Sequence, residues 1–372
     1  MSPAQVAIVY PRSSFMWDEA GVKSPTTIED ETNPNMDGRT TEYMAEVHGL
    51  FALVSQTLNI PVDFIDEDFL VDEPSRLARF RVVMVVEPSM PVESQNALAK
   101  FAQSGGTVLL TRGAAMLDRY GQPIEVLGAG IDSVQATPTA IGSVWSLPNT
   151  ANGTFLTRAG TAAAFAAFGQ VGRASPKLPT GSTVLAKFAD GSAAAVAVAP
   201  RPMRVADTGS VAGGGVGGGG GGGVIRLLWL PGLSWDHSGW LAGSGSFLRG
   251  VFDDAGVTTP AWTNAGSCIR SAGGLERGIE TPLLIAENGA ALTLLNWCGG
   301  NQTVEATALV GFTVGSVEAA VAGGSLAFRQ DARAGAVSVN VTVSDVEVVV
   351  FNRKADRPHK SAKVTRACIV RC

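Results

Sequence analysis

Four short apolar segments in the first 111 residues constrain the fold more than any other feature. They cover residues 5–10, 60–65, 81–86 and 107–111 and are rich in Val, Ile, Leu and Met. Runs of this kind are typical of strands buried on both faces of a parallel sheet. Helix signals separate them, so the alternation predicts an α/β fold with a doubly wound, mostly parallel sheet.

The expected helices follow from apolar spacing and from helix-ending residues. Residues 40–58 carry apolar side chains at helical spacing, namely Met44, Val47, Leu50, Phe51, Val54 and Leu58. A second helix is expected from Pro91 to the pair Gly105-Gly106. Residues 11–38 are polar and predict a long loop, and Asp66-Glu67-Asp68 predicts an acidic turn.

The alternation fades after residue 130. The Ala-rich run 159–169 predicts a short helix, and residues 182–188 and 193–199 predict paired strands. Residues 213–223 are nearly pure glycine, which has the most backbone entropy to lose and no side chain to pack. We therefore expect a disordered Gly-rich insert at about 201–223, inside an α/β domain that spans residues 1–270.

The C-terminal region has a different pattern. Short alternating strands are expected at 283–286, 291–297, 302–309, 316–321, 325–329, 336–343 and 346–351. Turn signals such as Asn288-Gly289 and Gly323-Gly324 separate them. This predicts an antiparallel β-sandwich domain at 279–352, followed by a basic, flexible tail at 353–372.

Composition and charge exclude several classes of function. The net charge is −5, whereas a general nucleic-acid binder is basic. The four cysteines and three histidines lack zinc-ligand spacing, so neither a metal nor a cofactor is expected. The sequence has no uninterrupted apolar stretch of about 18 residues, so no membrane span is expected. The N-terminus lacks the basic region of a signal peptide, which favours an intracellular location.

The segments together resemble a known arrangement. The matching runs are VAIVY (6–10), EVHGLFAL (46–53), IPVDFIDED (60–68), VVEPSMPVE (85–93), GGTVL (105–109) and LPGLSW (230–235). They are similar to the trimerisation domain of family 42 β-galactosidases, which has a class I glutamine-amidotransferase-like, flavodoxin-like fold. The run LTLLNW (292–297) is similar to the small β-domain that follows in that family.

The resemblance implies a function without its own active site. The family's catalytic acid and nucleophile are glutamates on a preceding TIM barrel, which takes about 250 residues. No such barrel fits in this chain, so no catalytic residue carries over. The resemblance implies a non-catalytic oligomerisation or accessory module of a glycoside hydrolase, forming a homo-oligomer, by analogy a trimer. A truncated gene product, a stand-alone subunit and a recruited domain all stay open.

A second hypothesis uses the carboxyl ends of the strands, where doubly wound sheets bind ligands. It places Trp17, Asp66, Glu87 and Ser89 in a ligand pocket. Asp66, Glu67, Asp68 and Glu87 could supply a carboxylate pair for acid–base chemistry near a carbohydrate. The chain would then be a small hydrolase or a sugar-binding protein.

Other nucleophile candidates are weaker. Ser89 lacks a Gly-x-Ser-x-Gly elbow, and a helix-capping role is favoured for it. No cysteine precedes Cys268, which excludes amidotransferase-type thiol chemistry on this sheet. Residues 234–238 place Ser, Asp and His close together, but triads converge from distant segments, so a polar turn is favoured.

Overall fold

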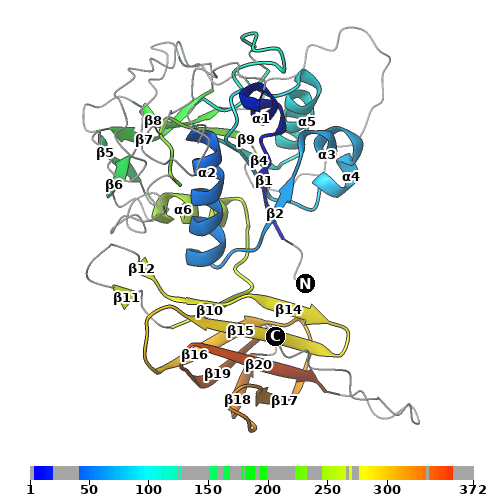
Figure 1. The fold of residues 1–372 in the computed structure, drawn as a ribbon, viewed down its shortest axis with the longest axis vertical. Helices are drawn as coiled ribbons and strands as arrows, with labels where there is room; N and C mark the ends of the chain where they lie inside the picture. Colours follow the sequence, from blue (N-terminus) through cyan, green and yellow to red (C-terminus); the bar gives the residue numbers. More distant parts are fainter. Residues whose placement is uncertain are drawn as a thin grey trace. The chain divides into compact units, whose positions relative to one another are not determined.

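The computed structural model describes residues 4–19, 42–111, 113–124, 126–127, 151–156, 162–167, 178, 181–188, 193–198, 223–232, 245–264, 268–269, 276–331 and 335–354. The chain divides into two compact units (Figure 1). An α/β unit comprises residues 2–260 and 266–280, and a β unit comprises residues 261–265 and 281–372.

A nine-stranded mixed sheet forms the centre of the α/β unit, in the order β2-β1-β3-β4-β9-β8-β7-β5-β6. The parallel half consists of β1 (Val6–Val9), β2 (Val62–Ile65), β3 (Val82–Val85), β4 (Thr107–Leu110) and β9 (Gly223–Leu227). The antiparallel half consists of β8 (Ala193–Val198), β7 (Thr183–Phe188), β5 (Ala151–Leu156) and β6 (Ala162–Ala167). The α/β class is confirmed, but the sheet is mixed and not mostly parallel.

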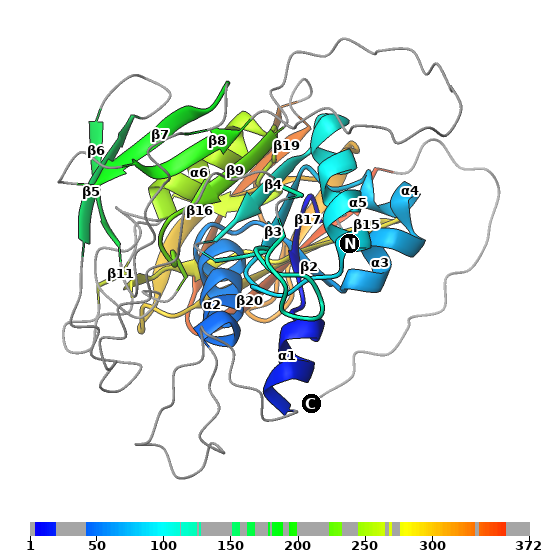
Figure 2. The same cartoon turned by 90° about the horizontal axis from the view of Figure 1, so that it is seen from above.

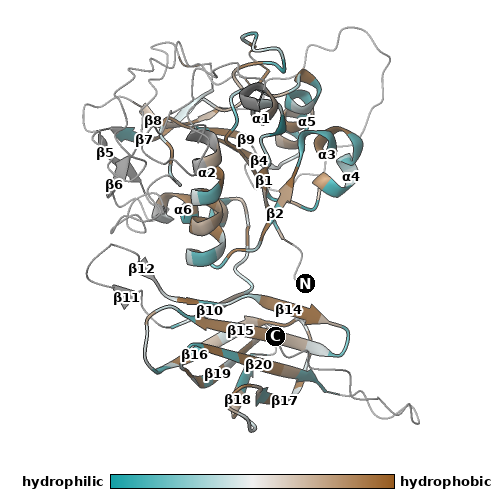
Figure 3. Ribbon diagram, in the orientation of Figure 1, coloured by the Kyte–Doolittle hydropathy of each residue, from teal (hydrophilic) through white to brown (hydrophobic). Residues whose placement is uncertain are grey.

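Helices cover both faces of the parallel half (Figures 1 and 2). One face carries α2 (Glu42–Phe51), which continues as a π-helical segment (Ala52–Thr57), and α6 (Ser246–Asp254). The other face carries α3 (Glu67–Asp72), α4 (Pro74–Leu77) and α5 (Val92–Gln103). Successive strand residues face opposite cores, as Ile8 and Ala7 do, which explains why these strands are apolar throughout (Figure 3).

The backbone of α2 lies in direct contact with the backbone of the segment after β9. A Cβ atom on Gly49 would lie 1.8 Å from the carbonyl oxygen of Gly232, and one on Gly232 would lie 2.4 Å from the amide nitrogen of Leu50. One turn earlier, Glu46 Oε1 accepts a hydrogen bond from the Gly232 amide at 3.0 Å. Two residues without side chains therefore permit this helix–loop contact.

Three local expectations are wrong, for physical reasons. The segment 11–38, which was expected to be a loop, contains α1 (Arg12–Glu19). The first residues of this helix follow Pro11 and have the composition of a turn, so the helix was not expected. The expected acidic turn is instead the start of α3, where Asp66 accepts a hydrogen bond from the Phe69 amide at 2.8 Å. The expected Ala-rich helix is β6, because antiparallel pairing with β5 overrides the helix propensity of alanine.

The β unit consists mainly of two antiparallel sheets. One contains β14 (Leu283–Ala286), β15 (Gly289–Asn296), β20 (Val346–Arg353) and β17 (Val314–Ala319). The other contains β10 (Ala261–Thr263), β16 (Gln302–Leu309), β19 (Ala336–Val343) and β18 (Phe328–Asp331). Strand β19 lies against both β15 and β20, so the two sheets face each other.

The alternation that predicted these strands is confirmed along β15, where Ala290, Leu292 and Leu294 are buried. The strand expected at 325–329 lies instead at residues Phe328–Asp331, as β18. Cys298, just after β15, is disulfide-bonded. Three further short strands lie in residues 266–280, which belong to the α/β unit: β11 (Cys268–Ile269), β12 (Glu276–Arg277) and β13 (Ile279–Glu280).

Some expectations fall outside the described residues. They are the Gly-rich insert up to residue 222, the Ser234–Ser238 cluster and the tail beyond Lys354. Within the described ranges, no helix has both the length and the apolar character needed to cross a membrane.

Candidate functional site

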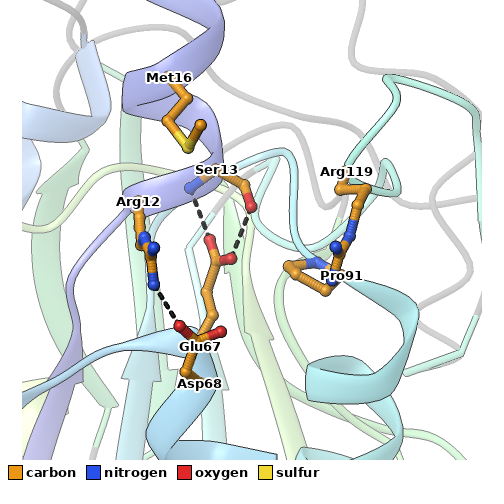
Figure 4. A pocket seen from close by; sticks show the side chains of 7 residues that line it. All are labelled: Arg12, Ser13, Met16, Glu67, Asp68, Pro91 and Arg119. Carbon is orange, nitrogen blue, oxygen red and sulfur yellow. Dashed lines mark hydrogen bonds and ion pairs between the residues drawn. The ribbon is translucent and has the colours of Figure 1, made fainter.

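A cavity of about 400 Å³ lies at the carboxyl end of the parallel strands (Figure 4). Its walls come from the segments that follow β1, β2, β3 and β4. The lining residues are Arg12, Ser13, Met16, Glu67, Asp68, Pro91 and Arg119. This is the edge at which open α/β sheets generally bind ligands.

Glu67 joins the start of α3 to the start of α1. Its side chain is buried, and its carboxylate accepts hydrogen bonds from the Ser13 amide at 2.7 Å and the Ser13 hydroxyl at 2.5 Å. Beside it, Arg12 forms an ion pair with Asp68 (Figure 4). Because the first amides of a helix carry partial positive charge, a carboxylate at this position stabilises α1.

Glu87 is fully buried, two residues after the end of β3. Burial raises the pKa of Glu87 well above its ordinary value of 4.5, and the negative charge of Glu67 and a hydrogen bond to that carboxyl group raise it further. Ser14, whose hydroxyl lies 3.5 Å from Glu87 Oε2, has the opposite effect on this pKa. Two adjacent buried carboxyl groups cannot both ionise at low cost, so we infer that Glu87 keeps its proton to a higher pH in the folded chain than in the unfolded one.

We expect Glu87→Gln to remove a pH-dependent loss of stability. Between pH 4.5 and the raised pKa of Glu87, the folded chain keeps a proton that the unfolded chain releases. The free energy of unfolding of the wild type therefore falls as pH rises in this window, by up to about 1.4 kcal/mol per pH unit. Below the window both states are protonated and this dependence vanishes.

Denaturant titrations at pH 4, 6 and 8 test this expectation. As pH rises, the free energy of unfolding of Glu87→Gln should increase relative to that of the wild type, because glutamine stays neutral. Parallel stability profiles would show that Glu87 is ionised in the folded chain.

The loop that carries Arg119 is held in place by buried hydrogen bonds. The Ala115 amide donates to the Glu87 carbonyl at 2.7 Å, and the Met90 amide donates to the Leu117 carbonyl at 3.0 Å. Arg226 on β9 donates to the Ala114 carbonyl at 2.8 Å, and burial lowers the pKa of Arg226 to about 9. This wall of the cavity is therefore bonded to the segment after β3 and to β9.

The residues expected at the strand ends have different roles. Trp17 lies on α1, with its side chain outside the described part of the chain. Asp66 is exposed and caps α3. Ser89 is buried and its amide donates to Ser14 Oγ at 3.2 Å, whereas the N-cap of α5 is Pro91 without a side-chain bond, so the expected capping role of Ser89 is wrong.

The structure brings Glu67 and Glu87 together, which is the carboxylate pairing that the sequence raised as a hypothesis. Sequence reasoning placed residues 10–17 at this edge of the sheet without singling out Ser13, Ser14 or Arg12, and it missed Arg119. The Pro11-Arg12-Ser13-Ser14 run after a strand is a helix-start signal that would have indicated the first three. Among the described residues, no group of three or more His, Cys, Asp or Glu side chains could hold a metal ion.

Comparison with known proteins shows the fold alone. No protein-family model and no curated protein matches this sequence. The solved β-galactosidase from Bacillus circulans sp. alkalophilus aligns over 94% of this chain and 41% of its own, with 14% identity and a TM-score of 0.57. Gan42B, a GH42 β-galactosidase from G. stearothermophilus, aligns over 94% and 40%, with 12% identity and a TM-score of 0.56.

The likeness extends to a second class of glycosidase. Alpha-L-fucosidase isoenzyme 2 from Paenibacillus thiaminolyticus aligns over 95% of this chain and 49% of its own, with 16% identity and a TM-score of 0.55. This chain therefore has the fold of part of these enzymes and spans less than half the length of each.

Proposed function

We propose that this chain is a non-catalytic, oligomerising accessory module of a β-galactosidase-like glycoside hydrolase. The observation that carries the proposal is the extent of the structural likeness, which covers 94% of this chain but about two fifths of each β-galactosidase. The similar fold in part of an α-L-fucosidase supports a role that does not depend on one sugar. The trimerisation-domain resemblance of the sequence supports the same role.

The edge of the parallel half offers a surface for a second copy of this chain. Strand β2 is at the end of the sheet order, and Phe64 on it is 47% exposed. The Phe64 ring lies 5.5 Å from that of Phe51, which makes a partly exposed aromatic pair. Exposed aromatic side chains are enriched in protein–protein contacts.

Sedimentation at micromolar concentration tests the assembly. We expect a mass that is a multiple of 38.3 kDa, by resemblance three times, and a lower mass for Phe64→Asp. Tyr120→Asp is the matched control, because Tyr120 is 69% exposed and lies far from β2 along the chain. A monomeric wild type would contradict the assembly role, and turnover of nitrophenyl β-galactoside by the purified chain would contradict the non-catalytic role.

A further inference from the structure

We propose that the cavity formed by α1, α3 and the loops after β3 and β4 binds a neutral polyhydroxyl ligand of hexose size. The inference is independent of the assembly role, because the residues that line the cavity do not include Phe64 or Phe51 of the proposed assembly surface. Cavities of roughly 300–1,000 Å³ hold small organic ligands, and this one has about 400 Å³.

The charges of the cavity favour a neutral ligand. The lining contains two arginines and two carboxylates, so its formal charges cancel. Arg12 and Asp68 form an ion pair with each other, and Arg119 forms one with Glu93, at 3.6 Å. An anionic ligand would meet the carboxylate of Glu67, and a cationic ligand would meet the guanidinium of Arg119.

The polar groups of the cavity match hydroxyl groups, which both donate and accept hydrogen bonds. Figure 4 shows Ser13 and Glu67 on one wall and Arg119 on the opposite wall, beside Pro91. The Glu67 carboxylate has acceptor capacity beyond its bonds to Ser13, and the Arg119 guanidinium has five N–H donors. A ligand between these walls would donate to Glu67 and accept from Arg119.

Two apolar side chains complete the site. Met16 is 61% exposed at the rim, and Pro91 forms part of the wall. Carbon-bound faces of a sugar ring can pack on such groups while the hydroxyls reach the polar walls. A charged or purely apolar small molecule would use only part of this surface.

Glu87 acts as a positioning residue for this site. Burying two carboxyl groups lowers stability relative to an apolar core, so their retention needs a reason. The Ser14 hydroxyl contacts Glu87, and the preceding residue, Ser13, donates two hydrogen bonds to Glu67. Glu87 therefore holds the start of α1, and through Ser13 the Glu67 carboxylate, at the cavity.

The test is calorimetric titration of the full chain with D-glucose, D-galactose and D-mannose, and with the charged analogues D-glucuronate and D-glucosamine. We expect at least one neutral hexose to bind more tightly than both charged sugars. Ser13→Ala and Glu67→Gln should each weaken that binding about tenfold. Ser13→Ala keeps the backbone bond to Glu67, so it leaves α1 attached.

Arg76→Gln is the matched control, because Arg76 is exposed and bonded to Glu73 away from the cavity, and we expect unchanged affinity. Failure of all three hexoses to bind at millimolar concentration would overturn the proposal. Tighter binding of a charged sugar would also overturn it, as would wild-type affinity in both cavity variants. None of these outcomes changes the oligomeric mass, so they are distinguishable from failure of the assembly role.

Discussion

Gly49→Ala is expected to lower the free energy of unfolding of the α/β unit by about 3 kcal/mol or more. The new methyl group would lie 1.8 Å from the Gly232 carbonyl oxygen and 2.3 Å from its carbonyl carbon. Both obstacles are backbone atoms, so no side-chain rotation relieves the overlap. The helix must move away from Gly232, which also breaks the hydrogen bond from the Gly232 amide to Glu46.

Gly250→Ala is the matched control for this substitution. Gly250 lies within α6, and a Cβ atom there would meet no atom within 4 Å. Alanine inside a helix is more favourable than glycine, so we expect a gain of about 0.5–1 kcal/mol. Urea unfolding followed by peptide-resolved hydrogen exchange reports on α2 and α6 separately from the β unit. A loss below 1 kcal/mol for Gly49→Ala would contradict the close approach of the two backbones.

Trp229→Ala is expected to cost about 3–5 kcal/mol, because it removes a large side chain from a closed core. Trp229 follows β9 and is fully buried. Its ring contacts Phe247 of α6 edge to face, with centroids 5.4 Å apart. The vacated space borders both the sheet and α6, so neither can fill it without moving.

The same unit contains a control for the Trp229 substitution. Tyr120 is 69% exposed, and Tyr120→Ala should change the free energy of unfolding by no more than about 0.5 kcal/mol. The same denaturation experiment compares the two variants. Similar losses for both would contradict the burial of Trp229.

The sequence predicted the parallel half of the sheet because its strands are buried on both faces. Val82, Val83, Met84 and Val85 are all fully buried, and an unbroken apolar run reports that environment directly. Helix α2 was predictable because one side of it faces a core. Short elements such as α1 were missed, since eight residues carry little periodic signal.

The candidate site was predictable only in part. The acidic residues after β2 and β3 are visible in the sequence, but their pairing depends on the strand order β2-β1-β3. Ser13 reaches Glu67 across 54 residues of chain, and no local pattern encodes that contact. Arg119 joins the cavity only because its loop bonds to the segment after β3.

The position of β9 in the sheet has a consequence for the order of folding. Strands β1 to β4 lie within the first 110 residues, whereas β4 pairs on its other side with β9, where Thr107 is opposite Gly223. Contacts this distant in sequence form late, because a long loop must close first. During synthesis the first four strands can assemble while one edge of β4 still has unpaired amides and carbonyls. Until Gly223–Leu227 arrives, that edge can pair with other nascent chains, so the aggregation risk is greatest at this stage of synthesis.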